Sequence, residues 1–185
     1  MSSILALVIP LVAFVVLAAV FIVLFRRASR SLARTRDEER FRRAVEDLAA
    51  RIDESLGGVI ERIDAVRRHQ VAATVIAPNL AAAREAVDRY TEEATALSGP
   101  TDTDDVRASL LAELERASRA LAMVDHGCGL LAVESGRHRE LEAQTAIKRG
   151  YLNALHAREA IARHAAELAA GRPANQRRWL SGRSS

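Results

Sequence analysis

The stretch that decides the fold is LLAELERASRALAMVDHGCGLL, residues 110–131. Its apolar residues recur at alternating steps of four and three, which places them on one face of an α-helix. The repeat continues across Gly127 and Gly129, so we expect one uninterrupted helix in which small residues allow a neighbouring helix to come close. The repeat consists of Leu110, Leu114, Ala117, Leu121, Val124, Cys128 and Leu131.

A second apolar repeat lies upstream, at residues 41–66. We expect its helix to continue to about residue 77, because Pro78 ends a helix or opens the next one. Gly57-Gly58 falls inside this repeat and marks either a bend or a close contact. The repeat consists of Phe41, Val45, Leu48, Ile52, Leu56, Val59, Ile63 and Val66.

Two further helices are expected, one from about Asn79 to Leu97 and one from about His138 to Ala170. Ser98-Gly99-Pro100 stops the first, and Gly171 stops the second. Each helix has one apolar face and therefore needs a partner. Because the links are short, antiparallel neighbours are favoured. We therefore predict a helical bundle with coiled-coil-like segments over residues 44–171.

The composition favours helix throughout. Alanine, leucine, glutamate and arginine dominate, aromatic residues make up 4%, and no run alternates as a strand does. The single cysteine excludes an intramolecular disulfide framework. The fold class is thus predicted to be all-α: a single N-terminal transmembrane helix followed by an antiparallel helical bundle.

The transmembrane prediction rests on ILALVIPLVAFVVLAAVFIVLF, residues 4–25, which carry no charge. At about 1.5 Å per residue this run spans a hydrocarbon core of roughly 30 Å. A cleaved signal peptide is the alternative, but it requires a basic start and a shorter apolar core. We therefore assign residues 1–25 to a retained anchor.

Arginines crowd residues 26–43, directly after the apolar run, whereas Met1-Ser2-Ser3 has no charged side chain. Arginine-rich flanks stay in the cytoplasm, so the N-terminus is predicted outside and the bundle inside, at a bacterial inner membrane. These arginines either set topology alone or also contact anionic headgroups. The candidate membrane-surface residues on this flank are Arg26, Arg27, Arg30, Arg34 and Arg36.

Residues 172–185 form a second basic segment, which we expect to be a flexible tail. It contains Trp179, a residue type that concentrates at membrane interfaces, although a chance tryptophan in a loose end is an equal alternative. The net charge is +5 for residues 26–43 and +4 for the tail, so residues 44–171 carry −6 of the total of +3. An acidic body is a poor platform for nucleic acid, and we expect no nucleic-acid partner.

One polar stretch, TAIKRGYLNALHAREAI at residues 145–161, holds the single lysine of the chain. Ile147, Tyr151, Ala154, Leu155 and Ile161 share one arc of this helix, and Arg149, Asn153, His156 and His164 share another. Long side chains on the border of the apolar arc can extend to solvent. The stretch is either an ordinary amphipathic surface or a face that binds a partner protein. The candidate partner face consists of Lys148, Leu152, His156 and Glu159.

The sequence predicts no catalytic, cofactor or metal site. Metal-binding helical bundles use Glu-x-x-His pairs, whereas this chain has His156-x-x-Glu159 and His164-x-x-Glu167 on one helix. Cys128 fits the apolar repeat and is expected to be a small buried residue rather than a zinc ligand with His126. No phosphate-binding or nucleophile-elbow motif occurs. We therefore expect a protein that is not an enzyme.

Ala77-Pro78-Asn79-Leu80 resembles a Pro-Asn-Leu element of LemA-type bacterial membrane proteins, which also combine a short N-terminal anchor with a helical bundle. The charged, aromatic-rich surroundings of that element are missing here. We therefore transfer no fold, activity or residue role from that family.

The expected function is interaction: a scaffold, assembly factor or regulator that holds a partner protein near the bilayer. The alternative is a membrane-anchored signalling or sensory helper in which Gly57-Gly58 transmits a bend. The stripe at 41–66 is also the best candidate for a parallel homodimer.

Overall fold

The computed structural model describes the backbone of residues 2–99, 103–132 and 137–171, and the side chains of Phe21 and of these residues from 35 onward. Its elements are α1 (Ser2–Arg67), α2 (Ala73–Ala96), α3 (Asp104–Ala132) and α4 (Arg137–Ala169), and no strand occurs among the described residues. The prediction of an all-α fold is confirmed. The chain divides into two compact units, residues 1–40 and 41–185, and the first consists of the N-terminal part of α1.

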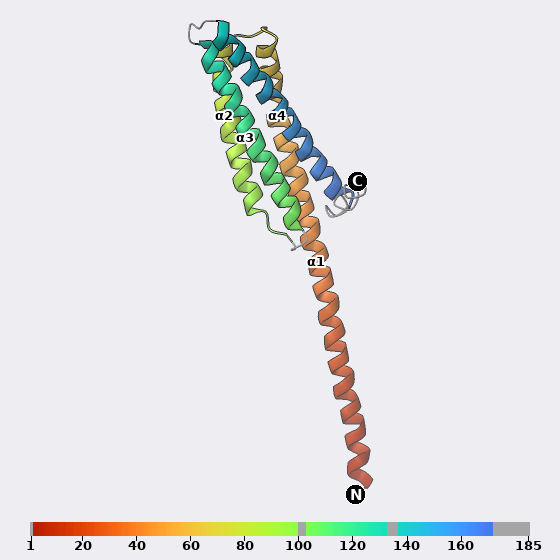
Figure 1. Cartoon of the computed structure of the whole chain (residues 1–185). Helices are drawn as coiled ribbons and strands as arrows, with labels where there is room; N and C mark the ends of the chain where they lie inside the picture. The colour runs from red at the N-terminus through yellow and green to blue at the C-terminus, as the bar shows by residue number, and fades with distance from the viewer. Residues whose placement is uncertain (1, 100–102, 133–136, 172–185) are drawn as a thin grey trace, which may run out of the picture. The chain divides into compact units, whose positions relative to one another are not determined.

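The second unit is an antiparallel bundle of four helices (Figure 1). Ion pairs between helices establish the neighbours: Arg51 of α1 contacts Glu93 of α2, Arg84 of α2 contacts Asp125 of α3, and Arg158 of α4 contacts Asp53 of α1. Consecutive helices of this unit run in opposite directions (Figure 1). The predicted helical bundle is therefore confirmed.

The four helices contribute unequally to one apolar core. α1 supplies large side chains, and all eight residues of the predicted 41–66 stripe are buried by the chain's own helices. Each such Leu, Ile or Val contributes about 1.5–3 kcal/mol when fully buried. α4 supplies mostly small residues, since only Ile147 and Ile161 are large among its buried positions. A parallel homodimer through 41–66 would have to displace these intramolecular contacts.

The small residues let the backbones of α3 and α4 approach closely. A Cβ atom added to Gly150 would lie 2.5 Å from Cγ2 of Val124 and 2.7 Å from the carbonyl oxygen of Ala120. A Cβ atom on Gly127 would lie 2.9 Å from the carbonyl oxygen of Ala143. The helix is continuous across both Gly127 and Gly129, as expected. Gly127 and Gly150 are therefore required by helix packing and not by a turn.

The end of the first bundle helix differs from the expectation of residue 77. α1 ends at Arg67, because His69 adopts a left-handed backbone with φ of 58°. The amide of Gln70 donates to the carbonyl of Ala65 (2.8 Å), and that of His69 donates to the carbonyl of Val66 (2.9 Å). This is the hydrogen-bond pattern of a Schellman cap, which usually uses glycine. A histidine in that position gives no comparable sequence signal.

The start of α2 also differs from the expectation of residue 79. α2 begins at Ala73 and contains Pro78 as its sixth residue. Pro78 lies just beyond the first four residues, whose amides have no intrahelical partner. It therefore costs the first turns of α2 one backbone hydrogen bond, that to the carbonyl of residue 74. The expected faces are otherwise present: Leu80, Val87 and Tyr90 of α2 are buried. α4 runs within one residue of the expected range at each end.

We predict that Gly150→Ala destabilises the bundle by about 1–3 kcal/mol, because the added methyl group cannot fit against the backbone of α3. Gly129→Ala is the matched control, since nothing lies within 4 Å of its added Cβ atom. That substitution should gain up to about 1 kcal/mol through helix propensity. Urea unfolding of the full chain in neutral detergent, followed by circular dichroism, compares the two variants. Equal stability of the two would contradict the close approach of α3 and α4.

Candidate functional site

The candidate partner face lies on the outer surface of α4. Lys148, Leu152, His156 and Glu159 are all exposed, while Ile147, Ala154 and Ile161 beneath them are buried. Tyr151 and Leu155, expected on the core arc, are half-buried. His164, expected on the polar arc, is also half-buried, with its side chain 16% exposed. The sequence pattern therefore separates the core of α4 from its surface correctly, with exceptions at the border.

The four candidate residues do not line one common hollow. His156 and Glu159 line a polar groove between α3 and α4, here called the Glu159 groove, with Glu113, Arg116 and Arg163. Lys148 lines a different, smaller cavity of about 140 Å³ near the end of α1, beside Arg67 and His69. Leu152 lines neither of these two hollows and is 41% exposed.

A third hollow, which the sequence pattern did not reveal, opens between α3 and α4. This Leu141 groove measures about 480 Å³. Met123 and Leu141 line it and are 38% and 61% exposed, which is unusual for large apolar residues in a bundle with a complete core. Its polar lining includes His126, His138, Glu142 and Arg149. Leu141 was visible only as an apolar residue outside the core repeat, and Met123 comes from another helix.

Charge is distributed unevenly among the four helices of the bundle. α4 has six cations against four carboxylates, a net of +2. α2 and α3 each carry −2, and residues 41–67 of α1 carry −1. α4 is therefore the one bundle helix with net positive charge.

Ion pairing follows the same division. All five arginines of α2 and α3 pair with a carboxylate. On α4, Arg158 pairs with Asp53, and the other five cations have no carboxylate partner within the part of the chain that the structure describes. These five are Arg137, Arg139, Lys148, Arg149 and Arg163.

The structure does not describe the side chains of most candidate membrane-surface residues. Arg36 is exposed. A search of the described residues finds no helix with a stretch long and apolar enough to cross a bilayer. Apart from Phe21, the side chains of the predicted anchor at 4–25 lie outside those residues. The same is true of the side chains of Arg26, Arg27, Arg30 and Arg34, and of Trp179.

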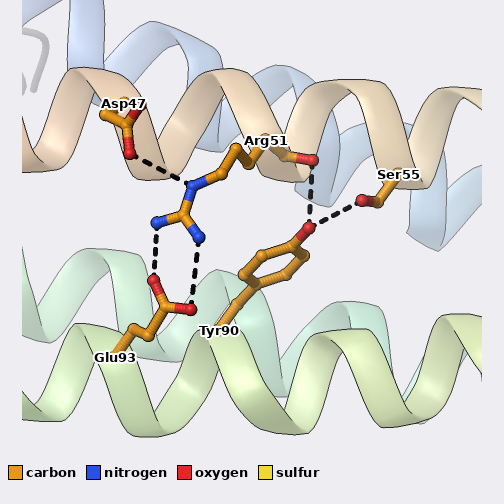
Figure 2. Close-up of polar contacts among 5 residues, drawn as sticks. All are labelled: Asp47, Arg51, Ser55, Tyr90 and Glu93. Carbon is orange, nitrogen blue, oxygen red and sulfur yellow. Dashed lines mark hydrogen bonds and ion pairs between the residues drawn. The ribbon is translucent and has the colours of Figure 1, made fainter.

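A polar cluster joins α1 to α2 (Figure 2). The Arg51 guanidinium donates to both carboxylate oxygens of Glu93, at 3.2 and 2.5 Å, and to Asp47 at 3.1 Å. The Tyr90 hydroxyl lies 2.7 Å from the Ser55 hydroxyl and donates to the carbonyl oxygen of Arg51 at 3.3 Å. The Arg51 guanidinium also lies 5.8 Å from the centre of the Tyr90 ring. These directional contacts fix the register of α1 along α2.

The same contacts shift the acid–base equilibria of the ion pair. The hydrogen bonds from Arg51 hold the pKa of Glu93 below its ordinary value. The hydrogen bonds to Glu93, in turn, raise the pKa of Arg51. Both groups are close to half exposed, so water screens their attraction and the stabilisation is small. The ion pair therefore contributes more to the alignment of α1 with α2 than to the free energy of unfolding.

Cys128 is buried in the core, as its place in the repeat predicts. Burial, together with the nearby Asp125 carboxylate, raises the pKa of its thiol to about 11. His126, two residues away, is exposed, so the two side chains do not converge. Among the residues with described side chains, no group of three metal-ligating residues gathers.

Comparison of the chain with models of known protein families, with curated proteins and with solved structures finds no match. The resemblance of residues 77–80 to the LemA-type element is therefore not accompanied by a family match.

We predict that Tyr90→Phe lowers the stability of the bundle by about 1 kcal/mol, because it removes two hydrogen bonds from a part-buried hydroxyl. The chain offers a matched control in Tyr151, whose hydroxyl has no hydrogen-bond partner among the described residues. Tyr151→Phe should change stability much less. Urea unfolding measures both, and similar losses would exclude a special role for the Tyr90 hydroxyl.

We also predict that Arg51→Met raises the pKa of Glu93 towards its ordinary value. In the wild-type chain this depressed pKa stabilises the fold above the ordinary carboxyl pKa, and the stabilisation is lost as the pH falls through the folded pKa. Titration of the Glu93 carboxyl carbon by NMR measures the shift directly. An unchanged pKa in Arg51→Met would show that the ion pair does not persist in solution.

Proposed function

We propose that this protein is a membrane-tethered interaction module. Residues 4–25 anchor it in a bacterial inner membrane, with the N-terminus outside, and the bundle lies in the cytoplasm. The bundle serves as a scaffold, assembly factor or regulator that holds a partner protein at the membrane surface.

The observation that carries this proposal is that the bundle completes its own core. The apolar stripes of all four helices are buried within one chain, so the bundle can act as a rigid body without a second subunit. The exposed face of α4, with its unpaired cations and exposed leucines, is then available to a partner. No buried polar or charged side chain occurs in the part of the bundle with described side chains.

The anchor is supported by the sequence of the N-terminal unit. The uncharged run at 4–25 is followed at once by arginines, the arrangement that orients single-pass proteins. α1 is helical from Ser2, and Phe21 within the run is 67% exposed. An exposed phenylalanine on an uncharged helix suits contact with lipid, where its transfer from water is favourable.

We predict that placing two charges in the middle of the run releases the chain from the membrane. Val15→Asp with Val16→Arg should insert poorly, because each charge at the centre of a span costs about 2.5–3.5 kcal/mol. The matched control is Val15→Leu with Val16→Leu, which should stay in the membrane fraction after an alkaline wash. If the charged variant also stayed there, the anchor would be wrong.

The orientation is tested on the same chain. A fluorescent protein fused after Ser185 should fluoresce, and alkaline phosphatase fused there should be inactive, because the C-terminus is placed in the cytoplasm. The reverse result would place the bundle outside.

A further inference from the structure

We propose that the outer face of α4 binds an acidic amphipathic helix of a partner protein, with one apolar side chain of that helix seated in the Leu141 groove. This inference rests on the proposed function and names the chemistry of the partner.

The apolar part of this surface has the spacing of a helix-binding site. At about 100° per residue, Leu141, Lys148, Leu152 and Glu159 lie within about 40° of one another on α4. Leu141 and Leu152 are three turns apart, about 16 Å along the axis. A helix that docks alongside presents its own anchors at positions i, i+4, i+7 and i+11, which cover that length. The Leu141 groove, with Met123 of α3 as its second apolar wall, receives the first anchor.

The charge of the surface selects an acidic partner. Arg149 lines the Leu141 groove, and Lys148 lines the smaller cavity near the end of α1. Neither has a carboxylate partner among the residues described. Glu142 is the one carboxylate in the lining of the groove, and α4 as a whole carries six cations against four carboxylates. Unsatisfied cations around an apolar centre steer an acidic helix and disfavour a basic one.

Binding of a defined probe to the full chain in neutral detergent tests this proposal. The probe is a fluorescein-labelled synthetic helix with leucine at i, i+4, i+7 and i+11 and glutamate elsewhere on its exposed face. Its binding is measured by fluorescence anisotropy. Two matched probes accompany it: one with lysine in place of glutamate, and one with the same composition but its leucines scrambled. The acidic amphipathic probe should bind at least about tenfold more tightly than either.

Paired variants of the protein locate the site. Lys148→Glu with Arg149→Glu should weaken binding of the acidic probe by about tenfold or more, and more strongly at low salt. Arg89→Glu with Arg119→Glu makes the same charge change on α2 and α3, where each arginine pairs only within its own helix, and should change binding less than about twofold. Leu141→Ala with Leu152→Ala should weaken binding at every salt concentration. Because both leucines are exposed, this variant should fold normally.

Other occupants give different results, and each would overturn the proposal. If both charge-reversed variants lose binding equally, the attraction is general and not located on α4. A second outcome is that the acidic probe fails to bind, while the wild-type chain binds phosphatidylglycerol vesicles and the reversal at Lys148 and Arg149 abolishes that binding. In that case the surface of α4 binds anionic lipid and not a helix. If light scattering shows a dimer that the same reversal dissociates, the occupant is a second copy of this chain.

The experiments distinguish a failure of the proposed membrane anchor from a failure of the proposed docking surface on α4. The α4 variants leave residues 4–25 unchanged and should remain in the membrane fraction, so a loss of probe binding does not bear on the anchor. A chain found outside the membrane would remove the anchor and leave the docking surface of α4 standing.

Discussion

The backbones of α3 and α4 lie so close that no side chain fits between them at Gly127 and Gly150. Each glycine faces the main chain of the other helix, Gly127 at Ala143 and Gly150 at Ala120. The two contacts lie seven residues apart on each helix, which is about two helical turns. Together they fix both the separation and the register of the pair. The remaining helices then pack their larger side chains against this closely joined pair, with α1 supplying most of the volume.

An apolar core made of alanine, leucine, isoleucine and valine tolerates sliding, because many registers bury similar area. In this bundle, directional contacts at the surface restrict it. The polar cluster around Arg51 and Tyr90 aligns α1 with α2, and the ion pair of Arg158 with Asp53 aligns α4 with α1. The Arg158 guanidinium packs against Gly57, where an added Cβ atom would lie 3.4 Å from its central carbon. That distance is an ordinary van der Waals contact, and nothing lies within 4 Å of a Cβ atom added to Gly58, so packing requires a glycine at neither position.

Periodicity predicted the parts of the fold that depend on single helices. It identified the buried faces of all four helices, because a buried face repeats at helical spacing whatever covers it. It misplaced the turn between α1 and α2, because His69 takes a backbone position usually filled by glycine and because Pro78 is tolerated near a helix start. For the candidate site, it predicted correctly that the four α4 residues are exposed, but it did not reveal the Leu141 groove. That groove combines Leu141 with Met123 of α3, and the pairing exists only after the two helices have packed.

Cys128 gives the bundle a chemical property that follows from its burial. The thiolate is the form that reacts with alkylating and oxidising reagents, and a thiol with a pKa of about 11 is almost entirely protonated at neutral pH. The side chain is also covered by the core, next to the tight contact at Gly127. Cys128 therefore stays unreactive while the helices are together and becomes reactive when α3 separates from its neighbours. Because it is the single cysteine of the chain, the rate at which a thiol reagent labels Cys128 measures how often the bundle opens.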